Sequence, residues 1–288
     1  MIRHGIWTAV ALVAALLLSG AVFAGEVDVT YGVTYAERDS GPMKADVYVP
    51  RGDGPFPGVL VVHGGAWRMG SRSQLGGVAQ LLAEHGFTAV AISYRLAPQY
   101  KFPAQIDDCK SAVRWMRSNA AAWKIDPEHI GGFGYSAGAH LVSLLGTTSP
   151  EDGLEGVSEA ATLPSTRLQA IAAGGAPCDF RPLPPDEDFL AFWLGGSRGT
   201  MPEQYRLASP AAFITADDPP FFFFHGENDQ LVPLMSPTQM QRALAAAGVS
   251  AELYTVPKLG HLACCMDRGA IERSVAFLEQ HLKTTSAK

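Results

Sequence analysis

Hydrophobic and polar residues alternate along two stretches near the start of the chain. Residues 27–35 (VDVTYGVTY) and 43–50 (MKADVYVP) show the period of two that places successive side chains on opposite faces of a strand. Between them, residues 36–42 (AERDSGP) are rich in turn-forming residues. We therefore predict an antiparallel hairpin in this region.

From residue 57 onwards, continuous apolar runs take turns with helical patterns. The apolar runs are typical of strands buried on both faces of a sheet, and the helical patterns carry apolar residues on one face. The predicted strands lie in residues 57–65, 87–96, 129–136, 168–177, 219–226 and 251–257, and the predicted helices in 73–86, 104–123, 137–146, 236–248 and 269–283. This order predicts an α/β fold with one mostly parallel central sheet, the antiparallel hairpin at its N-terminal end, and helices on both faces.

Two segments, residues 148–167 and 181–218, break this alternation. Because both lie between core strands, we interpret them as loops or short helices over the active-site edge of a single domain that spans residues 25–288. The second segment contains an apolar cluster of Phe189, Leu190, Phe192 and Trp193. This cluster either lines a substrate pocket or packs on the core as an ordinary small helix.

Composition narrows the class of protein. The chain has 288 residues, of which 47% are hydrophobic and 17% charged, so it can bury one large core. The chain carries a net charge of −6, and its sequence contains no cluster of basic residues. Nucleic acid is therefore not an expected partner.

Residues 1–24 have the layout of a secretory signal peptide. Arg3 precedes a long apolar run, and small residues lead to a cleavage position after Ala24. The alternative is an uncleaved membrane anchor, because no charge interrupts the chain between His4 and Glu26. With cleavage we expect a secreted or periplasmic protein that is not stably inserted in a membrane.

Export would permit disulfide bonds among the four cysteines, Cys109, Cys178, Cys264 and Cys265. Their spacing fits no metal-binding pattern. A bond between the adjacent Cys264 and Cys265 would be strained. Two interpretations stay open: small buried apolar side chains, or one bridge from Cys178 to Cys264 or Cys265.

Residues 131–140 (GGFGYSAGAH) place Ser136 between Gly134 and Gly138, where a predicted strand turns into a predicted helix. Glycines allow the strand and helix to approach closely while the serine occupies a strained turn with its hydroxyl exposed. The N-terminal amides of the helix, that of Ala137 first, are suited to a developing oxyanion. A neutral hydroxyl is a weak nucleophile, so Ser136 needs a base.

Six histidines are candidates for this base. His261 follows the last strand in a loop at the carboxyl edge of the sheet, where open parallel sheets bind ligands. The other five fit plainer roles: surface positions for His85 and His129, a buried helical position for His140, and structural hydrogen bonds for His63 and His225. We therefore predict His261 as the base.

An acid must orient this histidine. Asp229, in the loop after the preceding strand, would lie at the same edge of the sheet. Glu227 and Asp179 stay open as alternatives. The order Ser136, Asp229, His261 is the order expected of one particular fold.

Residues 63–67 (HGGAW) follow the first buried strand, and their two glycines let backbone amides face a ligand. They would supply the remaining oxyanion donors. Trp67 is either a stacking platform for a sugar or aromatic ring, or a side chain packed against the sheet.

Taken together, these motifs resemble those of α/β-hydrolases, in particular carboxylesterases grouped with acetylxylan and feruloyl esterases, near the hormone-sensitive-lipase and arylformamidase branches. The resemblance covers roughly residues 30–283 and rests on HGGAW, SYRLAP (93–98), FPAQIDD (102–108), GYSAGAH, and HGENDQLVP followed by GH. It implies an α/β-hydrolase fold and a catalytic triad of Ser136, Asp229 and His261. It further implies that the amides of Gly64, Gly65 and Ala137 form the oxyanion hole.

The predicted function is that of an exported serine esterase that works through an acyl-enzyme without metal or organic cofactor. Its expected substrates are short-chain or aromatic acyl esters, including esters on plant polysaccharides. The alternatives are an arylformamidase, a small serine peptidase, and a non-catalytic binding protein on a hydrolase fold.

Overall fold

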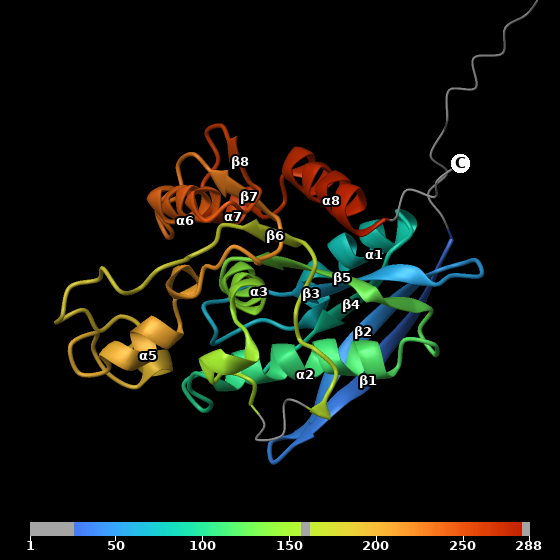
Figure 1. The fold of residues 1–288 in the computed structure, drawn as a ribbon, viewed down its shortest axis with the longest axis horizontal. Coiled ribbons are helices and arrows are strands. Elements are labelled where there is room, and N and C mark those ends of the chain that lie inside the picture. Colours follow the sequence, from blue (N-terminus) through green and yellow to red (C-terminus); the bar gives the residue numbers. More distant parts are fainter. Residues whose placement is uncertain (1–25, 157–161, 284–288) are drawn as a thin grey trace, which may run out of the picture.

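The computed structural model describes residues 26–156 and 162–283. These residues form an eight-stranded sheet flanked by helices (Figure 1). The predicted signal peptide, residues 1–24, lies outside the described residues. Within them, no helix has both the length and the apolar character needed to cross a membrane.

The predicted hairpin is confirmed. Strands β1 (Val27–Arg38) and β2 (Gly41–Pro50) pair antiparallel, and Arg38 lies opposite Gly41. The predicted turn over residues 36–42 was wrong in length, because pairing continues until only two residues remain for the turn. A two-residue connection is a common link between antiparallel strands, and the polar side chains near the turn do not prevent pairing.

The other six strands run parallel to one another, as predicted. The sheet order is β1-β2-β4-β3-β5-β6-β7-β8, and β2 joins the parallel part through antiparallel pairing with β4. These strands are β3 (Phe56–Val62), β4 (Thr88–Ile92), β5 (Ile125–Tyr135), β6 (Ile171–Gly174), β7 (Phe221–Gly226) and β8 (Ala251–Val256).

The long helices cover both faces of the sheet, also as predicted. The core on one face includes α1 and α8, which lie near each other in Figure 1. The core on the other face includes α2, α3 and α6. These helices are α1 (Gly76–Glu84), α2 (Ala104–Ser118), α3 (Ala137–Thr147), α6 (Met235–Ala246) and α8 (Arg268–Leu282).

Strand β7 shows why the parallel strands are almost wholly apolar. Its four consecutive phenylalanines alternate between the two cores: Phe221 and Phe223 face one, Phe222 and Phe224 the other. All four are buried. A strand with helices over both faces has no solvent side on which to place a polar residue.

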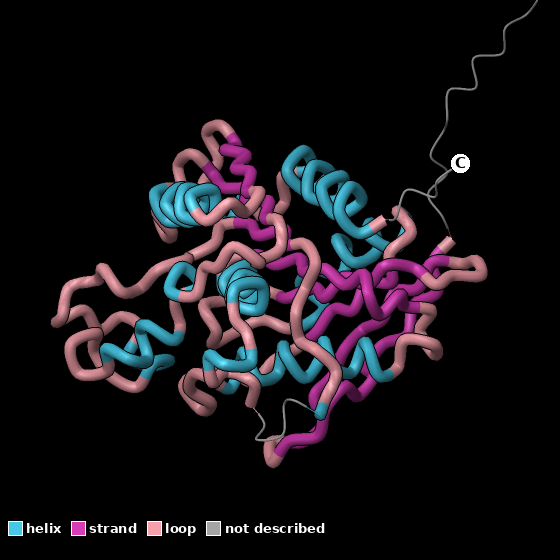
Figure 2. The backbone as a smooth tube through the Cα atoms, viewed as in Figure 1, coloured by secondary structure: helices cyan, strands magenta, loops and turns pink. Residues whose placement is uncertain are grey.

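The segment 181–218 is mostly loop (Figure 2), with two short helices, α4 (Ala191–Leu194) and α5 (Pro202–Leu207), and a 3-10 turn, η4 (Pro210–Ala212). One further short helix, α7 (His261–Cys264), lies where the sequence predicted a loop. It is a single turn, too short for an apolar pattern to reveal it.

All four cysteines are free thiols, so no bridge joins Cys178 to Cys264 or Cys265. Cys109, Cys178 and Cys264 are buried. Burial raises the pKa of the Cys178 thiol to about 12 and that of Cys264 to about 11, so both are protonated at neutral pH. Of the two interpretations left open, the structure therefore favours small buried side chains.

A buried ionic cluster fixes the first inserted segment to helix α2. The Glu155 carboxylate pairs with the Lys110 ammonium and with the Arg114 guanidinium. Thr166 also donates a hydrogen bond to Glu155, 3.2 Å away. The Lys110 side chain is fully buried, and this desolvation lowers its pKa. Its charge is therefore tolerated only while its partner is present.

We predict that Glu155→Ala lowers the free energy of unfolding by about 3–5 kcal/mol, because it leaves a buried ammonium unpaired. Urea unfolding measures the change. Glu151→Ala is the control, because Glu151 is an exposed carboxylate in the same segment; it should shift the free energy by no more than about 0.5 kcal/mol. Equal effects of the two substitutions would contradict the assignment.

Candidate active site

Ser136 lies at the sharp turn between strand β5 and helix α3, as predicted. Its φ of 55° and ψ of −118° are a conformation that residues with a Cβ rarely adopt. The Ser136 amide donates to the Gly174 carbonyl at 2.7 Å, which fastens the turn to β6. Strain held in this way is common at reactive side chains.

Gly138 explains how the turn can be so tight. A Cβ on Gly138 would lie 1.9 Å from the Val62 carbonyl oxygen of β3, and one on Gly134 would lie 2.4 Å from the Gly138 backbone. Helix α3 therefore contacts the strands backbone to backbone. Only glycine permits this approach.

His261 and Asp229 meet Ser136 in a continuous hydrogen-bonded chain. The His261 Nε2 lies 2.8 Å from the Ser136 Oγ, and the His261 Nδ1 lies 2.6 Å from the Asp229 Oδ2. The structure thus brings together the three residues predicted as the triad. His261 is the first residue of α7 rather than a loop residue, and the Tyr135 hydroxyl donates to its carbonyl oxygen.

Asp229 is held by its own loop. Its Oδ1 accepts hydrogen bonds from the amides of Leu231 and Val232, each at 2.9 Å, while its Oδ2 faces His261. The Asp229 side chain is fully buried. A buried carboxylate with these partners can orient an imidazole and stabilise its cationic form.

The two alternative acids lie elsewhere. The Asp179 carboxylate forms a two-pronged ion pair with Arg181, with both contacts at 2.8 Å. The exposed Glu227 accepts a hydrogen bond from the Lys258 amide at 2.8 Å. Neither forms a hydrogen bond or ion pair with His261 in the part of the chain that the structure describes.

The predicted oxyanion loop lies against the serine. A Cβ on Gly64 would lie 3.3 Å from the Ser136 Cβ. The next three residues, Gly65, Ala66 and Trp67, have φ values of 111°, 49° and 58°. Ala137 begins helix α3, and amides in the first turn of a helix have no acceptor within the helix.

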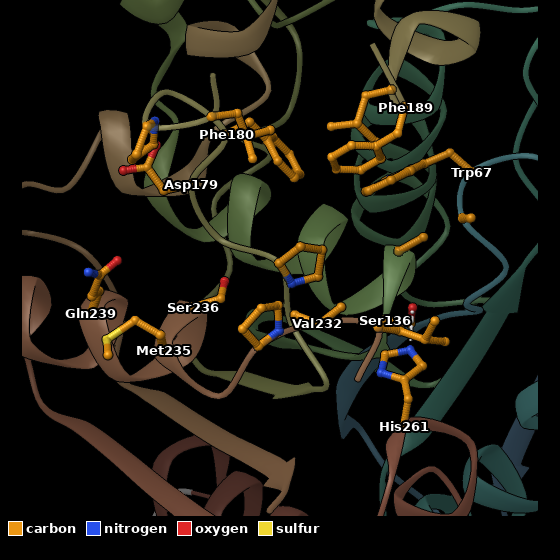
Figure 3. Close-up of a pocket in the computed structure, with 18 of the residues that line it drawn as sticks. Trp67, Ser136, Asp179, Phe180, Phe189, Val232, Met235, Ser236, Gln239 and His261 are labelled. Carbon is orange, nitrogen blue, oxygen red and sulfur yellow. Dashed lines mark hydrogen bonds between the residues drawn. The ribbon is translucent and has the colours of Figure 1, made fainter. Parts of the chain in front are cut away.

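Ser136 and His261 open into a pocket of about 490 Å³ (Figure 3), whereas Asp229 lies buried behind His261. Ser136 and His261 lie together at one end, and Gln239, Met235 and Asp179 lie towards the other. Its walls are mostly apolar. The inserted segment contributes Pro182, Leu183, Pro184, Phe189, Leu190 and Phe192.

The apolar cluster in this segment therefore has two roles. Phe189, Leu190 and Phe192 line the pocket, whereas Trp193 is fully buried in the core. Each interpretation weighed from the sequence applies to part of the cluster. None of the described residues in 148–167 lines this pocket, so a covering role for that segment stays a prediction.

Trp67 also lines the pocket, but its side chain is only 5% exposed. Its ring stacks on Trp193, with centroids 3.8 Å apart and an interplanar angle of 4°. Little of its surface remains for a sugar to stack on, so this packing favours the packed interpretation.

A protein-family model described as BD-FAE matches residues 45–244, which is more than half of the chain. The chain belongs to the BD-FAE family. This match and the esterases described next confirm the resemblance drawn from the sequence motifs, and the solved esterase structures confirm the predicted α/β-hydrolase fold.

Individual proteins similar to this BD-FAE chain include esterases. Esterase LipQ of Mycobacterium tuberculosis (strain ATCC 25618 / H37Rv) is 32% identical over 212 residues, which are 71% of this chain and 50% of LipQ. The chain thus spans half the length of that relative. A solved truncated form of a carbohydrate esterase from gut microbiota superposes with a TM-score of 0.79 at 25% identity, covering 89% of this chain and 96% of the other.

Esterase 2 of the Planctomycetes species Thermogutta terrifontis, solved with butyrate bound, has a TM-score of 0.73 at 26% identity. The superposition covers 90% of this chain and 94% of that one. The superpositions thus extend over nearly the whole of both solved chains.

In this BD-FAE chain the SYRLAP and FPAQIDD motifs brace the site rather than line it. The buried Asp108 carboxylate accepts hydrogen bonds from the Arg95 amide and guanidinium, at 2.9 Å each, and from Arg38 at 3.0 Å. Gln105 donates to the Arg95 carbonyl at 3.0 Å. These contacts join α2 to the loop that follows β4.

His140 is fully buried behind the site. Its Nδ1 accepts a hydrogen bond from the Trp67 Nε1 at 3.2 Å, and its Nε2 lies 2.6 Å from the Ala208 carbonyl oxygen. Burial lowers its pKa to about 4. The sequence predicted the buried helical position but gave no signal for either partner.

We predict that Gly138→Ala prevents the close approach of α3 and lowers the free energy of unfolding by about 3 kcal/mol. Gly77→Ala is the matched control, because a Cβ there has nothing within 4 Å; the exchange should be neutral or stabilise by up to about 1 kcal/mol. Chemical unfolding of both variants measures the difference, and a stable Gly138→Ala protein would contradict it.

His140 should make the free energy of unfolding decrease as the pH falls below 6.5. Between pH 6.5 and 4 the unfolded chain protonates this histidine and the folded protein does not, so stability falls as the pH falls. The asparagine in His140→Asn does not titrate. We predict that the unfolding free energy of wild type minus that of His140→Asn is about 3 kcal/mol smaller at pH 4 than at pH 7. An equal difference at both pH values would show that His140 is not held neutral.

Proposed function

We propose that this chain is a serine carboxylesterase in which Ser136, His261 and Asp229 form the catalytic triad. The observation that carries the proposal is the hydrogen-bonded chain from Asp229 through His261 to Ser136, at the end of an apolar pocket. A non-catalytic binding protein would have no use for this alignment. The names of the similar proteins, which are esterases, support the same reaction class.

The geometry of the triad supports the following acylation step. His261 Nε2 takes the proton as Ser136 Oγ attacks the ester carbonyl, and Asp229 stabilises the imidazolium through Nδ1–H. The negative charge on the former carbonyl oxygen is stabilised by amides of Gly64, Gly65 and Ala137. When the tetrahedral intermediate collapses, His261 returns the proton to the departing alcohol, and the acyl group stays on Ser136.

Deacylation repeats these steps with water as the nucleophile. His261 removes a proton from water as the oxygen attacks the acyl-enzyme, then protonates Ser136 Oγ as the carboxylic acid departs. No metal or organic cofactor takes part in this scheme.

The pocket supports esters with an apolar acyl or alcohol group. A volume of about 490 Å³ with phenylalanine, leucine and proline in its walls suits a short aliphatic or an aromatic group. The similarity to a carbohydrate esterase supports a sugar-linked ester as one natural form of substrate. We further propose that residues 1–24 direct export, which would give the enzyme access to plant polysaccharides outside the cell.

The test is hydrolysis of p-nitrophenyl esters from acetyl to dodecanoyl by the mature chain. We expect turnover of the acetyl or butyryl ester, and a fall in kcat of about 10⁴-fold or more in Ser136→Ala. An aryl formamide assayed alongside detects an arylformamidase. Wild-type protein that turns over none of these compounds would contradict the proposed function.

The acid is tested by a matched pair of substitutions. Asp229→Asn should lower kcat by about 10⁴-fold, because the amide no longer holds the imidazole in the required tautomer. Asp179→Asn, at the far end of the same pocket, should stay within about threefold of wild type. The reverse ranking would move the acid to Asp179.

A further inference from the structure

Trp67 connects the predicted oxyanion loop to two distant parts of the chain. It follows Ala66 directly, and in Figure 3 it lies on the Ser136 side of the pocket. Its backbone carbonyl accepts a hydrogen bond from the Ala97 amide at 2.9 Å. Its side chain is held separately, by His140 and by Trp193.

The contact with His140 defines one protonation state. An indole N–H can only donate, so the His140 Nδ1 facing it at 3.2 Å must carry a lone pair. The Ala208 carbonyl can only accept, so the His140 Nε2 facing it at 2.6 Å must carry the proton. Only the neutral Nε2–H tautomer makes both bonds.

The contact with Trp193 comes from the inserted segment. The two indole rings stack face to face, and the Trp193 Nε1 donates to the Gln105 Oε1 at 2.9 Å. The Trp193 carbonyl accepts from the Phe102 amide at 3.0 Å. Trp193 is therefore held by α2 and by Phe102 just before that helix, and it cannot shift without breaking these bonds.

The backbone next to Trp67 needs such support. Ala66 and Trp67 both have positive φ, where an L-residue clashes with its own carbonyl group. Left alone, these residues would relax to negative φ and rotate the neighbouring peptide planes. The amides of Gly64 and Gly65, which are assigned to the oxyanion, come immediately before these planes in the same loop, so such a rotation would displace them as well.

We propose that His140 and Trp193 are positioning residues for the oxyanion loop: by clamping the Trp67 side chain they hold residues 65–67 in the conformation that aims backbone amides at the reacting carbonyl. This inference rests on the proposed esterase function. It also gives the segment 181–218 a second task, because Trp193 and the Ala208 carbonyl both belong to it.

Three substitutions separate positioning from mere packing. His140→Leu removes the acceptor for Trp67, Trp67→Phe removes the donor but keeps an aromatic ring against Trp193, and His140→Asn keeps an acceptor near the Nδ1 position. Val113→Ala, a fully buried position on α2, controls for loss of stability alone. Each protein is assayed with p-nitrophenyl butyrate, with a methyl trifluoromethyl ketone as inhibitor, and by thermal unfolding.

If His140 and Trp193 hold the oxyanion loop, the substitutions should weaken stabilisation of the transition state and leave substrate binding nearly unchanged. His140→Leu and Trp67→Phe should lower kcat by about 10- to 100-fold with KM within about threefold of wild type. The ketone adds to Ser136 to give an oxyanion, so its inhibition constant should rise in parallel with the loss of kcat. His140→Asn should recover most of kcat, and Val113→Ala should keep kcat while it unfolds at a lower temperature.

Two results would overturn the clamp, and they differ from each other. If the wild type is active and both Trp67→Phe and His140→Leu keep full kcat and inhibitor affinity, the clamp is refuted. The esterase proposal then stands. A wild type inactive on every ester refutes both. If His140→Leu does not fold, Trp67→Phe decides, with His140→Asn as its conservative partner.

Discussion

The close approach of helix α3 to the sheet is the constraint on which the rest of the site depends. At Gly138 the helix backbone meets the Val62 carbonyl with no room for a Cβ. That contact fixes where the helix can begin and so forces the chain through positive φ at Ser136. A strained residue survives only where its surroundings leave it no alternative, and here the surroundings are two strands and a helix in direct contact.

Parallel strands explain how residues far apart in the sequence meet in one hydrogen-bonded chain. His261 lies 32 positions after Asp229 and 125 positions after Ser136. β5, β7 and β8 all end at the same edge of the sheet, so the segments after them, which carry Ser136, Asp229 and His261, converge there. The contacts add precision: the Tyr135 hydroxyl binds the His261 carbonyl, and the Asp229 loop closes on its own carboxylate. The fold brings the three side chains of the triad near one another, and these local hydrogen bonds fix their exact positions.

Much of this was readable from the sequence, because the signals were local. Apolar runs gave the strands, and glycines around Ser136 gave the turn. What could not be read depends on contacts between remote residues. The one-turn helix α7 has no periodic pattern, and the separation of Trp193 from its pocket-lining neighbours follows from the stack on Trp67, 126 positions away in the chain. The same holds for Trp67 itself, which the sequence left between two interpretations until its neighbours were known.

The Asp229 loop carries a consequence for how such a protein can diverge. One carboxylate oxygen faces the imidazole, and the other holds the amides of Leu231 and Val232, whose side chains form a wall of the pocket. The same carboxylate therefore sets both the alignment of the base and the shape of the space beside it. Insertions or deletions in this wall would disturb the acid, whereas the segment 181–218 has no such tie to Asp229. New specificities should accordingly arise at pocket-lining positions of that segment such as Phe189 and Phe192, which hold neither Asp229 nor the Trp67 side chain.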